Sequence, residues 1–118
     1  MSQKRLCVIL LASLVLVVGC VNINDIVITS PDLNRIADGT YRGSSKVGPV
    51  RVTLDVSARS GAITSIQIVK HINGRGKRAE EIVPAIIKAQ SLDVDVISGA
   101  TFSSKAILKA SENALSGK

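Results

Sequence analysis

Aromatic residues and histidine are scarce in this chain of 118 residues. Aromatics make up 2% of it, as Tyr41 and Phe102 with no tryptophan, and His71 is the single histidine. Proteins that bind single strands without sequence preference stack bases on aromatic side chains, so the composition argues against nucleic acid as a partner. One histidine gives no basis for a Ser/His/Asp triad. The sequence also shows neither a metal-ligand cluster nor a glycine-rich dinucleotide motif.

The first 20 residues combine a positive segment, an apolar run and a cysteine. Lys4 and Arg5 precede a mostly apolar run of 12 residues, 7–18, which is too short for a typical membrane span and typical of a signal peptide. The run ends in Val-Val-Gly-Cys, where Gly19 would admit the peptidase and the thiol of Cys20 would accept a lipid. The pattern resembles a lipobox. The alternative is an ordinary secretory signal that ends in a cysteine by chance.

These features divide the chain into a signal peptide at 1–19, a lipid-anchored tether at 20–31 and one small domain at 32–118. Cys7 would leave with the signal and Cys20 would be acylated, so the domain has no thiol for a disulfide, a metal or a nucleophile. Loss of residues 1–19 removes two bases and no acid, which lowers the formal net charge from +6 to +4. We expect an exported, mildly basic, membrane-anchored lipoprotein.

The middle of the chain alternates apolar and polar residues, which is the pattern of half-buried strands. Every second residue is apolar in 50–56, and the alternation returns at 65–68 after a turn at 57–61. With 40–45 as the first strand, these segments predict an antiparallel meander. Residues 92–97 are extended in character and are a candidate for a short fourth strand.

Three segments have the signals of helices: 30–38, 77–90 and 103–115. The first would begin at Ser30 as N-cap with Pro31 at its first position. Pro84 should kink or split the second helix. Ser103 or Ser104 would cap the third. Strands followed by helices predict an α+β fold, with an antiparallel meander of about three to four strands and helices packed on one side.

One stretch carries more hydroxyl groups than a turn needs: Asp95-Val96-Ile97-Ser98-Gly99-Ala100-Thr101. It precedes a predicted helix, where unpaired backbone N–H groups and the helix dipole favour an anion. Gly99 and Ala100 leave the approach open, Thr101 places a hydroxyl near the helix start, and Lys105 lies one turn further on. The residues alone predict a candidate phosphate site and leave open a Ser/Thr-rich capping turn.

The same stretch resembles the flavinylation motif of the FMN-binding domain family, Asp-x-x-Ser/Thr-Gly-Ala-Thr/Ser. All fixed positions are present, as Asp95, Ser98, Gly99, Ala100 and Thr101. The resemblance extends through "DGTYRG", "GPVRVTLDV", "GAITSIQIVKH" and the C-terminal segment, from about Asp38 to Leu115. The family includes the FMN-carrying subunits of sodium-pumping quinone reductases and of Rnf-type complexes, and this chain is similar to its small single-domain members.

The resemblance implies that Thr101 carries FMN through a phosphoester bond. A separate Mg-dependent flavin transferase would make this bond, with FAD as donor and AMP as product. Asp95 would help the transferase to engage or activate the acceptor, and residues 98–100 would shape the loop and contact the phosphate. A threonine hydroxyl is a weak nucleophile, which explains the need for an enzyme and a metal. Ser103, the alternative acceptor, is assigned to capping.

The contacts of the flavin ring are less clearly implied. His71 ends the long strand, where larger family members have a histidine followed by a Glu-Thr-Pro-Gly loop, and that loop is absent here. His71 is a candidate to touch the ring or tune its charge, or else a partly exposed strand-end residue. Three cations would either stabilise the phosphate or the reduced flavin, or simply lie in a solvated loop: Arg75, Lys77 and Arg78. The two aromatic residues, Tyr41 and Phe102, would contact either the flavin ring or the core.

Together these features predict an extracytoplasmic domain that carries covalent FMN and relays electrons. Its small size favours an electron carrier or redox subunit over a stand-alone enzyme, and a membrane or extracytoplasmic redox partner would supply and accept electrons. Two alternatives stay open. One is a non-redox lipoprotein that binds a partner or an anionic ligand, and the other is a small flavin-dependent reductase.

Overall fold

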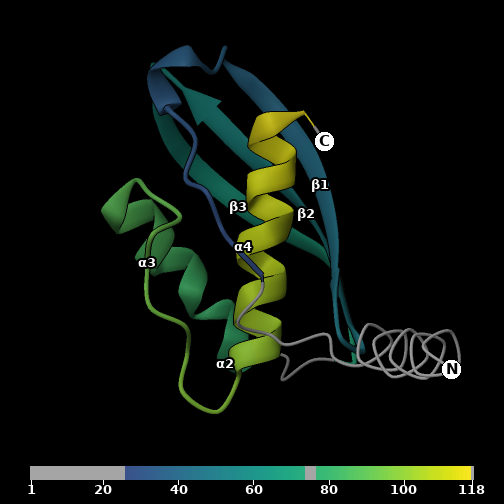
Figure 1. The fold of residues 1–118 in the computed structure, drawn as a ribbon. Coiled ribbons are helices and arrows are strands. Elements are labelled where there is room, and N and C mark those ends of the chain that lie inside the picture. The colour runs from purple at the N-terminus through teal and green to yellow at the C-terminus, as the bar shows by residue number, and fades with distance from the viewer. Residues whose placement is uncertain (1–25, 74–76, 118) are drawn as a thin grey trace, which may run out of the picture.

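A three-stranded antiparallel sheet forms from the alternating segments of the chain (Figure 1). The computed structural model describes residues 26–73 and 77–117; the predicted signal peptide, Cys20 and Arg75 lie outside these ranges. The strands are β1 (Gly39–Val47), β2 (Val50–Arg59) and β3 (Ala62–Ile72), in the order β1-β2-β3. The predicted meander is confirmed, with three strands.

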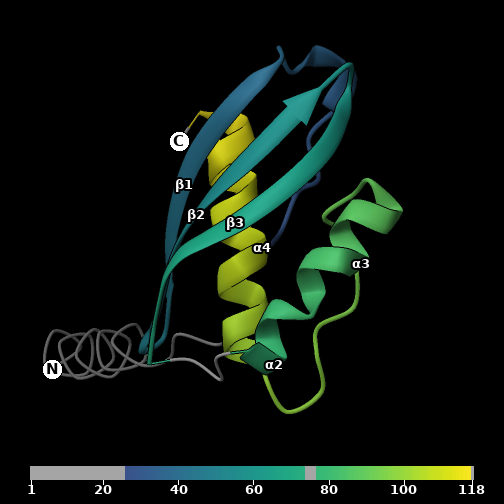
Figure 2. The same cartoon turned by 180° about the vertical axis from the view of Figure 1, so that it is seen from behind.

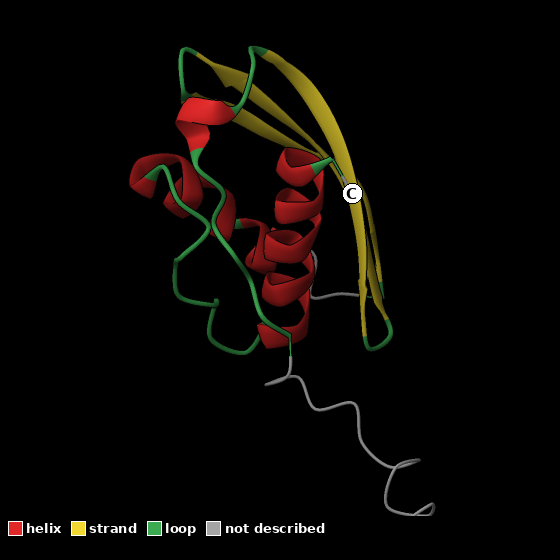
Figure 3. Cartoon of the chain, turned by 45° about the horizontal axis from the view of Figure 1, so that its top comes forward, coloured by secondary structure: helices red, strands yellow, loops and turns green. Residues whose placement is uncertain are grey.

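One face of the sheet is buried and the other is exposed. Alternate side chains of β2, from Val50 to Ala58, are at most 4% exposed. The helix α4 (Thr101–Ser116) lies across this face (Figures 1 and 2). It contributes a stripe of buried residues that includes Ile107 and Ala110. Figure 3 shows the helices on one side of the sheet. The α+β prediction is therefore confirmed.

A glycine in β1 lets the sheet and α4 approach closely. A Cβ built on Gly43 would lie 2.0 Å from the carbonyl oxygen of Ala110 and 2.5 Å from the nitrogen of Ala114. Two residues further on, Ser45 Oγ donates to the carbonyl oxygen of Ala106 at 2.5 Å. The second glycine of "DGTYRG" is thus a packing requirement, because any side chain would push the helix away.

The helix predicted over 77–90 is divided, as expected, into α2 (Lys77–Glu80) and α3 (Ile82–Ala89). Pro84 explains the break, since it has no N–H to donate to the carbonyl of Glu80 and its ring crowds that carbonyl. Ile82 and Ile86 of α3 are fully buried.

The predicted helix over 30–38 is wrong. Only a short 3-10 helix, η2 (Leu33–Arg35), forms there, and Asp32 is its N-cap. The hydroxyl of Ser30 accepts a hydrogen bond from the backbone nitrogen of Leu92 at 3.0 Å. Ser30 therefore joins two distant segments of chain, which replaces the local capping role that the sequence suggests.

The candidate fourth strand at 92–97 is also wrong. This segment has no strand partner among the described residues and runs irregularly from α3 towards α4. Leu92 is 1% exposed, and Val94 and Ile97 are partly buried against the core. The apolar residues of the segment therefore serve packing without strand pairing.

The end of the predicted tether packs against the domain. Ile26 and Ile28 are partly buried against the core, and Lys109 Nζ of α4 donates to the carbonyl oxygen of Val27 at 3.3 Å. Among the helices formed by the described residues, none has the length and apolar character needed to cross a membrane.

An ion pair crosses β1 and β2 on the exposed face. The Arg42 guanidinium donates to both carboxylate oxygens of Asp55, at 2.8 and 3.1 Å. These hydrogen bonds, reinforced by the opposite charge, lower the pKa of Asp55 below its ordinary value and raise the pKa of Arg42. The Arg42 side chain is 63% exposed, so solvent screens the pair.

Candidate functional site

The hydroxyl-rich motif forms the loop that leads into α4. The helix begins at Thr101, and its N-cap is Ala100, whose side chain makes no cap hydrogen bond. The prediction that Ser103 or Ser104 caps this helix is therefore wrong, because both lie within its first turn and are at most 1% exposed. The hydroxyl of Ser104 instead accepts from the backbone nitrogen of Ile97 at 3.0 Å and holds the loop against the helix.

The N-terminus of α4 is open to an anion. The hydrogen bond from Ser104 N to Ala100 O, at 2.9 Å, is the first to close a turn of this helix. The N–H groups of Thr101 and Phe102 precede it and make no hydrogen bond within the described part of the chain. A serine or aspartate at the cap would have satisfied such a donor. With alanine there, both donors and the dipole of this 16-residue helix are available to an anion.

The loop that leads into α4 also lies beside an arginine. Gly99 has a φ of +79°, in the left-handed region that favours glycine. A Cβ built on Gly99 would lie 3.9 Å from Cζ of Arg78 in α2. Guanidinium groups bind phosphate through directed, charge-assisted hydrogen bonds. Of the three cations considered from the sequence, the structure brings Arg78 to the loop.

A cleft of about 410 Å³ opens beside Thr101, within the range of small-molecule sites. Its walls come from the β1–β2 turn, the end of β3 and the start of α4: Pro49, Val50, Asn73, Gly99, Ala100, Thr101, Phe102 and Ser103. Phe102 is 47% exposed, and its ring lies over Gly48, where a Cβ would be 3.2 Å from two ring carbons. An exposed aromatic ring in such a cleft can pack against a flat heterocycle.

Three residues of this cleft, Pro49, Val50 and Asn73, are not among the site residues predicted from the sequence. Asn73 Nδ2 donates to the carbonyl oxygen of Pro49 at 3.2 Å, which fastens the end of β3 to the β1–β2 turn. Val50 begins β2. Only the folded sheet shows that Asn73 lies beside the motif.

The other motif residues surround the acceptor without lining the cleft. Asp95 and Ser98 are exposed in the irregular loop. Lys105 is partly buried in α4, one turn after Thr101. These positions leave the loop accessible to a second protein.

His71 and Tyr41 are not among the residues that line the cleft. His71 pairs with Val52 across the sheet, so it shares the helix-covered face, and both of its ring nitrogens are buried without a hydrogen-bond partner among the described residues. The Tyr41 hydroxyl donates to the carbonyl oxygen of Ala37 at 2.5 Å, and its ring packs against the core. Phe102 is therefore the aromatic residue at the site.

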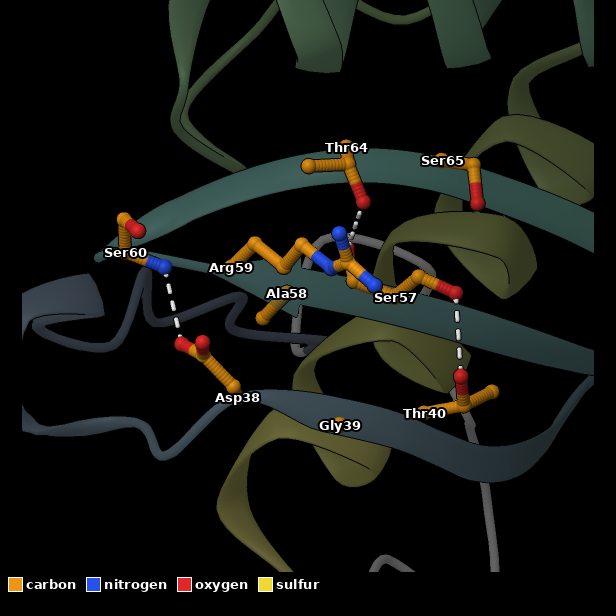
Figure 4. Close-up of a pocket in the computed structure, with 9 residues that line it drawn as sticks. All are labelled: Asp38, Gly39, Thr40, Ser57, Ala58, Arg59, Ser60, Thr64 and Ser65. Atoms are coloured by element: carbon orange, nitrogen blue, oxygen red, sulfur yellow. Dashed lines mark hydrogen bonds between the residues drawn. The ribbon is translucent and has the colours of Figure 1, made fainter.

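A larger concavity of about 820 Å³ lies at the other end of the sheet (Figure 4). It is lined by residues 38–40, 57–60 and 64–65, and several of its polar groups already bond to each other. For example, the hydroxyls of Thr40 and Ser57 are 3.1 Å apart. The length of β2 puts it about 30 Å from the motif. It contains no motif residue, so the smaller cleft is the candidate functional site.

Comparison with known proteins identifies the family of this chain. The model of the FMN-binding domain family matches residues 46–116, which include β2, β3 and α2–α4. An uncharacterized protein of Treponema pallidum (strain Nichols) is 36% identical over 81 residues, which cover 66% of this chain and 22% of that protein. The chain thus spans about a fifth of the length of this relative. The family match covers more than half of the chain, and the protein belongs to the FMN-binding domain family.

Proposed function

We propose that this protein is an extracytoplasmic electron-transfer domain that carries FMN in a phosphoester bond to Oγ1 of Thr101. The observation that supports this most is the position of the Thr101 hydroxyl. It is exposed at the start of α4, next to two unbonded backbone N–H groups and the 410 Å³ cleft. Ser103, the alternative acceptor, is 1% exposed, which makes its hydroxyl a poor target for an external enzyme.

The attachment step fits an accessible loop. Oγ1 of Thr101 would attack the phosphorus of the FMN half of FAD, lose its proton, and break the bond between the two phosphates so that AMP leaves. A Mg-dependent flavin transferase would activate this weak nucleophile. Asp95 and Ser98 are exposed in the irregular segment before α4, where the transferase can reach them.

Once bound, FMN supplies the redox chemistry, and the protein supplies position and electrostatics. The N–H groups of Thr101 and Phe102 and the guanidinium of Arg78 would hold the phosphate. The Phe102 ring and the Asn73 side chain would border the space next to it. These residues fit a phosphate joined to a flat aromatic group.

The N-terminal signal and the Val-Val-Gly-Cys pattern support export and a lipid anchor on Cys20. A covalent bond would keep the cofactor from being lost to the medium. Electrons would come from, and pass to, membrane or extracytoplasmic redox partners. A flavin-dependent reductase that acts on a soluble acceptor is the second candidate.

The test is coexpression of the full chain with a flavin transferase, followed by flavin fluorescence in a denaturing gel. The wild-type band should fluoresce, Thr101→Ser should retain flavin, and Thr101→Ala should lose it. Ser103→Ala is the matched control and should stay labelled. Undiminished fluorescence in Thr101→Ala would show that FMN is not attached to Thr101. Rapid turnover of a soluble acceptor by the isolated protein would favour the reductase.

A further inference from the structure

The charged side chains of the sheet are almost all positive. The strands contain the cations Arg42, Lys46, Arg51, Arg59 and Lys70 and one acid, Asp55. Asp55 is paired with Arg42. The other acids of the described residues lie in helices and loops. The sheet face opposite α4 therefore carries positive charge that its own strands do not neutralise.

Three of these cations and one isoleucine form a cluster, which we call the basic patch: Lys46, Arg51, Lys70 and Ile72. Lys46 lies directly opposite Arg51, and Arg51 lies opposite Ile72 on the next strand. Lys70 is two residues before Ile72, on the same face. Within residues 26–73 and 77–117 none of the three cations makes an ion pair.

This arrangement is unfavourable for the isolated domain. Like charges directly opposite each other on neighbouring strands destabilise a sheet. Ile72 leaves 48% of its surface exposed among these charges. An acidic partner would neutralise these opposed cations, and the exposed Ile72 side chain beside them would lose its water in the same contact.

The basic patch lies behind the cofactor site. Arg51 directly follows Val50, and Ile72 directly precedes Asn73; both Val50 and Asn73 line the cleft beside Thr101. The alternation of side chains along a strand puts the patch on the opposite face of the same sheet end. A protein docked on the patch would be close to a flavin in the cleft.

We propose that the basic patch docks an acidic protein that exchanges electrons with the flavin. This inference rests on the proposed function. Complementary charge accelerates encounter and fixes orientation, and Ile72 would supply a desolvated contact.

The path of the segment around Val27 favours a protein over an anionic membrane as the partner of the basic patch. The carbonyl of Val27 is bound by Lys109, so this segment runs along α4, on the side away from the patch (Figures 1 and 3). A lipid anchor that precedes this segment would leave the exposed face of the sheet free for a soluble partner.

The binding test uses the full chain and fluorescently labelled poly-L-glutamate as the acidic probe. The variant Lys46→Gln/Arg51→Gln/Lys70→Gln should bind on the order of tenfold more weakly at low salt. The control Arg35→Gln/Arg59→Gln/Lys88→Gln removes the same charge from exposed sites outside the patch and should stay close to wild type. Equal weakening of both variants would show that only net charge matters and would overturn the proposal.

Further measurements separate this proposal from the covalent attachment of flavin and from binding to a membrane. Binding of the probe does not need flavin, so Thr101→Ala should bind like wild type, and failure of the covalent attachment would leave this test intact. In flavin-loaded protein, reoxidation by hexacyanoferrate(III), which takes one electron per ion, should slow on the order of tenfold in the patch variant but not in the control. Patch-dependent binding to anionic phosphatidylglycerol vesicles without binding to poly-L-glutamate would assign the patch to the membrane and overturn a protein partner.

Discussion

At the scale of single residues, His71 is a polar side chain whose hydrogen-bonding capacity is unused among the described residues. Its two ring nitrogens are buried without a partner among the described residues. An unpaired buried polar group costs about 1–3 kcal/mol, so His71→Leu should leave the free energy of unfolding of the flavin-free protein unchanged or raise it by about 1 kcal/mol. Urea denaturation measures this, with Lys70→Leu on the exposed face as control.

A role of His71 at the flavin would give a different result. The visible spectrum of flavin-loaded His71→Leu would then shift relative to wild type, whereas a purely structural histidine would leave it unchanged. Loss of more than about 2 kcal/mol of stability in the flavin-free variant would contradict the prediction, since it would show that the imidazole makes a favourable contact in the fold.

The hydroxyl groups of the motif show how far residue types can be interpreted from sequence. The motif identifies Thr101 as the acceptor by resemblance, and its exposure agrees with that role. The structural roles of Ser103 and Ser104 were less predictable. Ser104 bonds to Ile97, and the cap is Ala100, because the helix begins three or four residues earlier than a cap at Ser103 or Ser104 would place it. A helix start depends on packing that a local pattern does not contain.

At the scale of elements, the contact between β1 and α4 depends on Gly43. A side chain here would collide with backbone atoms of Ala110 and Ala114, which cannot rotate away. We expect Gly43→Ala to destabilise the domain by about 3 kcal/mol, at the upper end for overpacking. Chemical denaturation of Gly43→Ala and of the exposed neighbour variant Ser44→Ala tests this. A loss in Gly43→Ala no larger than that in Ser44→Ala would mean that the helix shifts without penalty.

The elements predicted correctly are those with a strong internal period. The strands alternate with period two, and α4 repeats its apolar residues at helical spacing. The two segments predicted wrongly, 30–38 and 92–97, contact each other through the hydrogen bond from Leu92 N to Ser30 Oγ. Each segment takes its conformation from the other and from the core, so neither carries a local pattern that would reveal it.

At the scale of the whole molecule, the candidate site and the segment that begins at Ile26 lie on different parts of the fold. The cleft lies where the β1–β2 turn, the end of β3 and the start of α4 meet, which brings together residues 49–50, 73 and 99–103. The segment from Ile26 runs along the helical side (Figure 1). An anchor on that side would leave both the cleft and the basic patch accessible, which suits a tethered carrier.

The same segment should contribute to the stability of the whole domain, although the family match begins only at residue 46. Ile26, Ile28, Leu33 and Ile36 are partly buried against the core. A chain that begins at Asp38 should therefore be less stable than one that begins at Ile26, by about 3 kcal/mol, from the apolar surface that it would expose. Ile28→Ser in the longer chain should reproduce about 1 kcal/mol of this loss.

Val27→Ser is the matched control, because Val27 is 69% exposed between two partly buried isoleucines and should change the free energy of unfolding by less than about 0.5 kcal/mol. Urea denaturation of the four proteins gives the comparison. If the chain that begins at Asp38 is as stable as the longer one, residues 26–37 merely lie on the surface. A loss in both the shorter chain and Ile28→Ser would instead make this segment part of the folded domain, so that the free tether is shorter than residues 20–31.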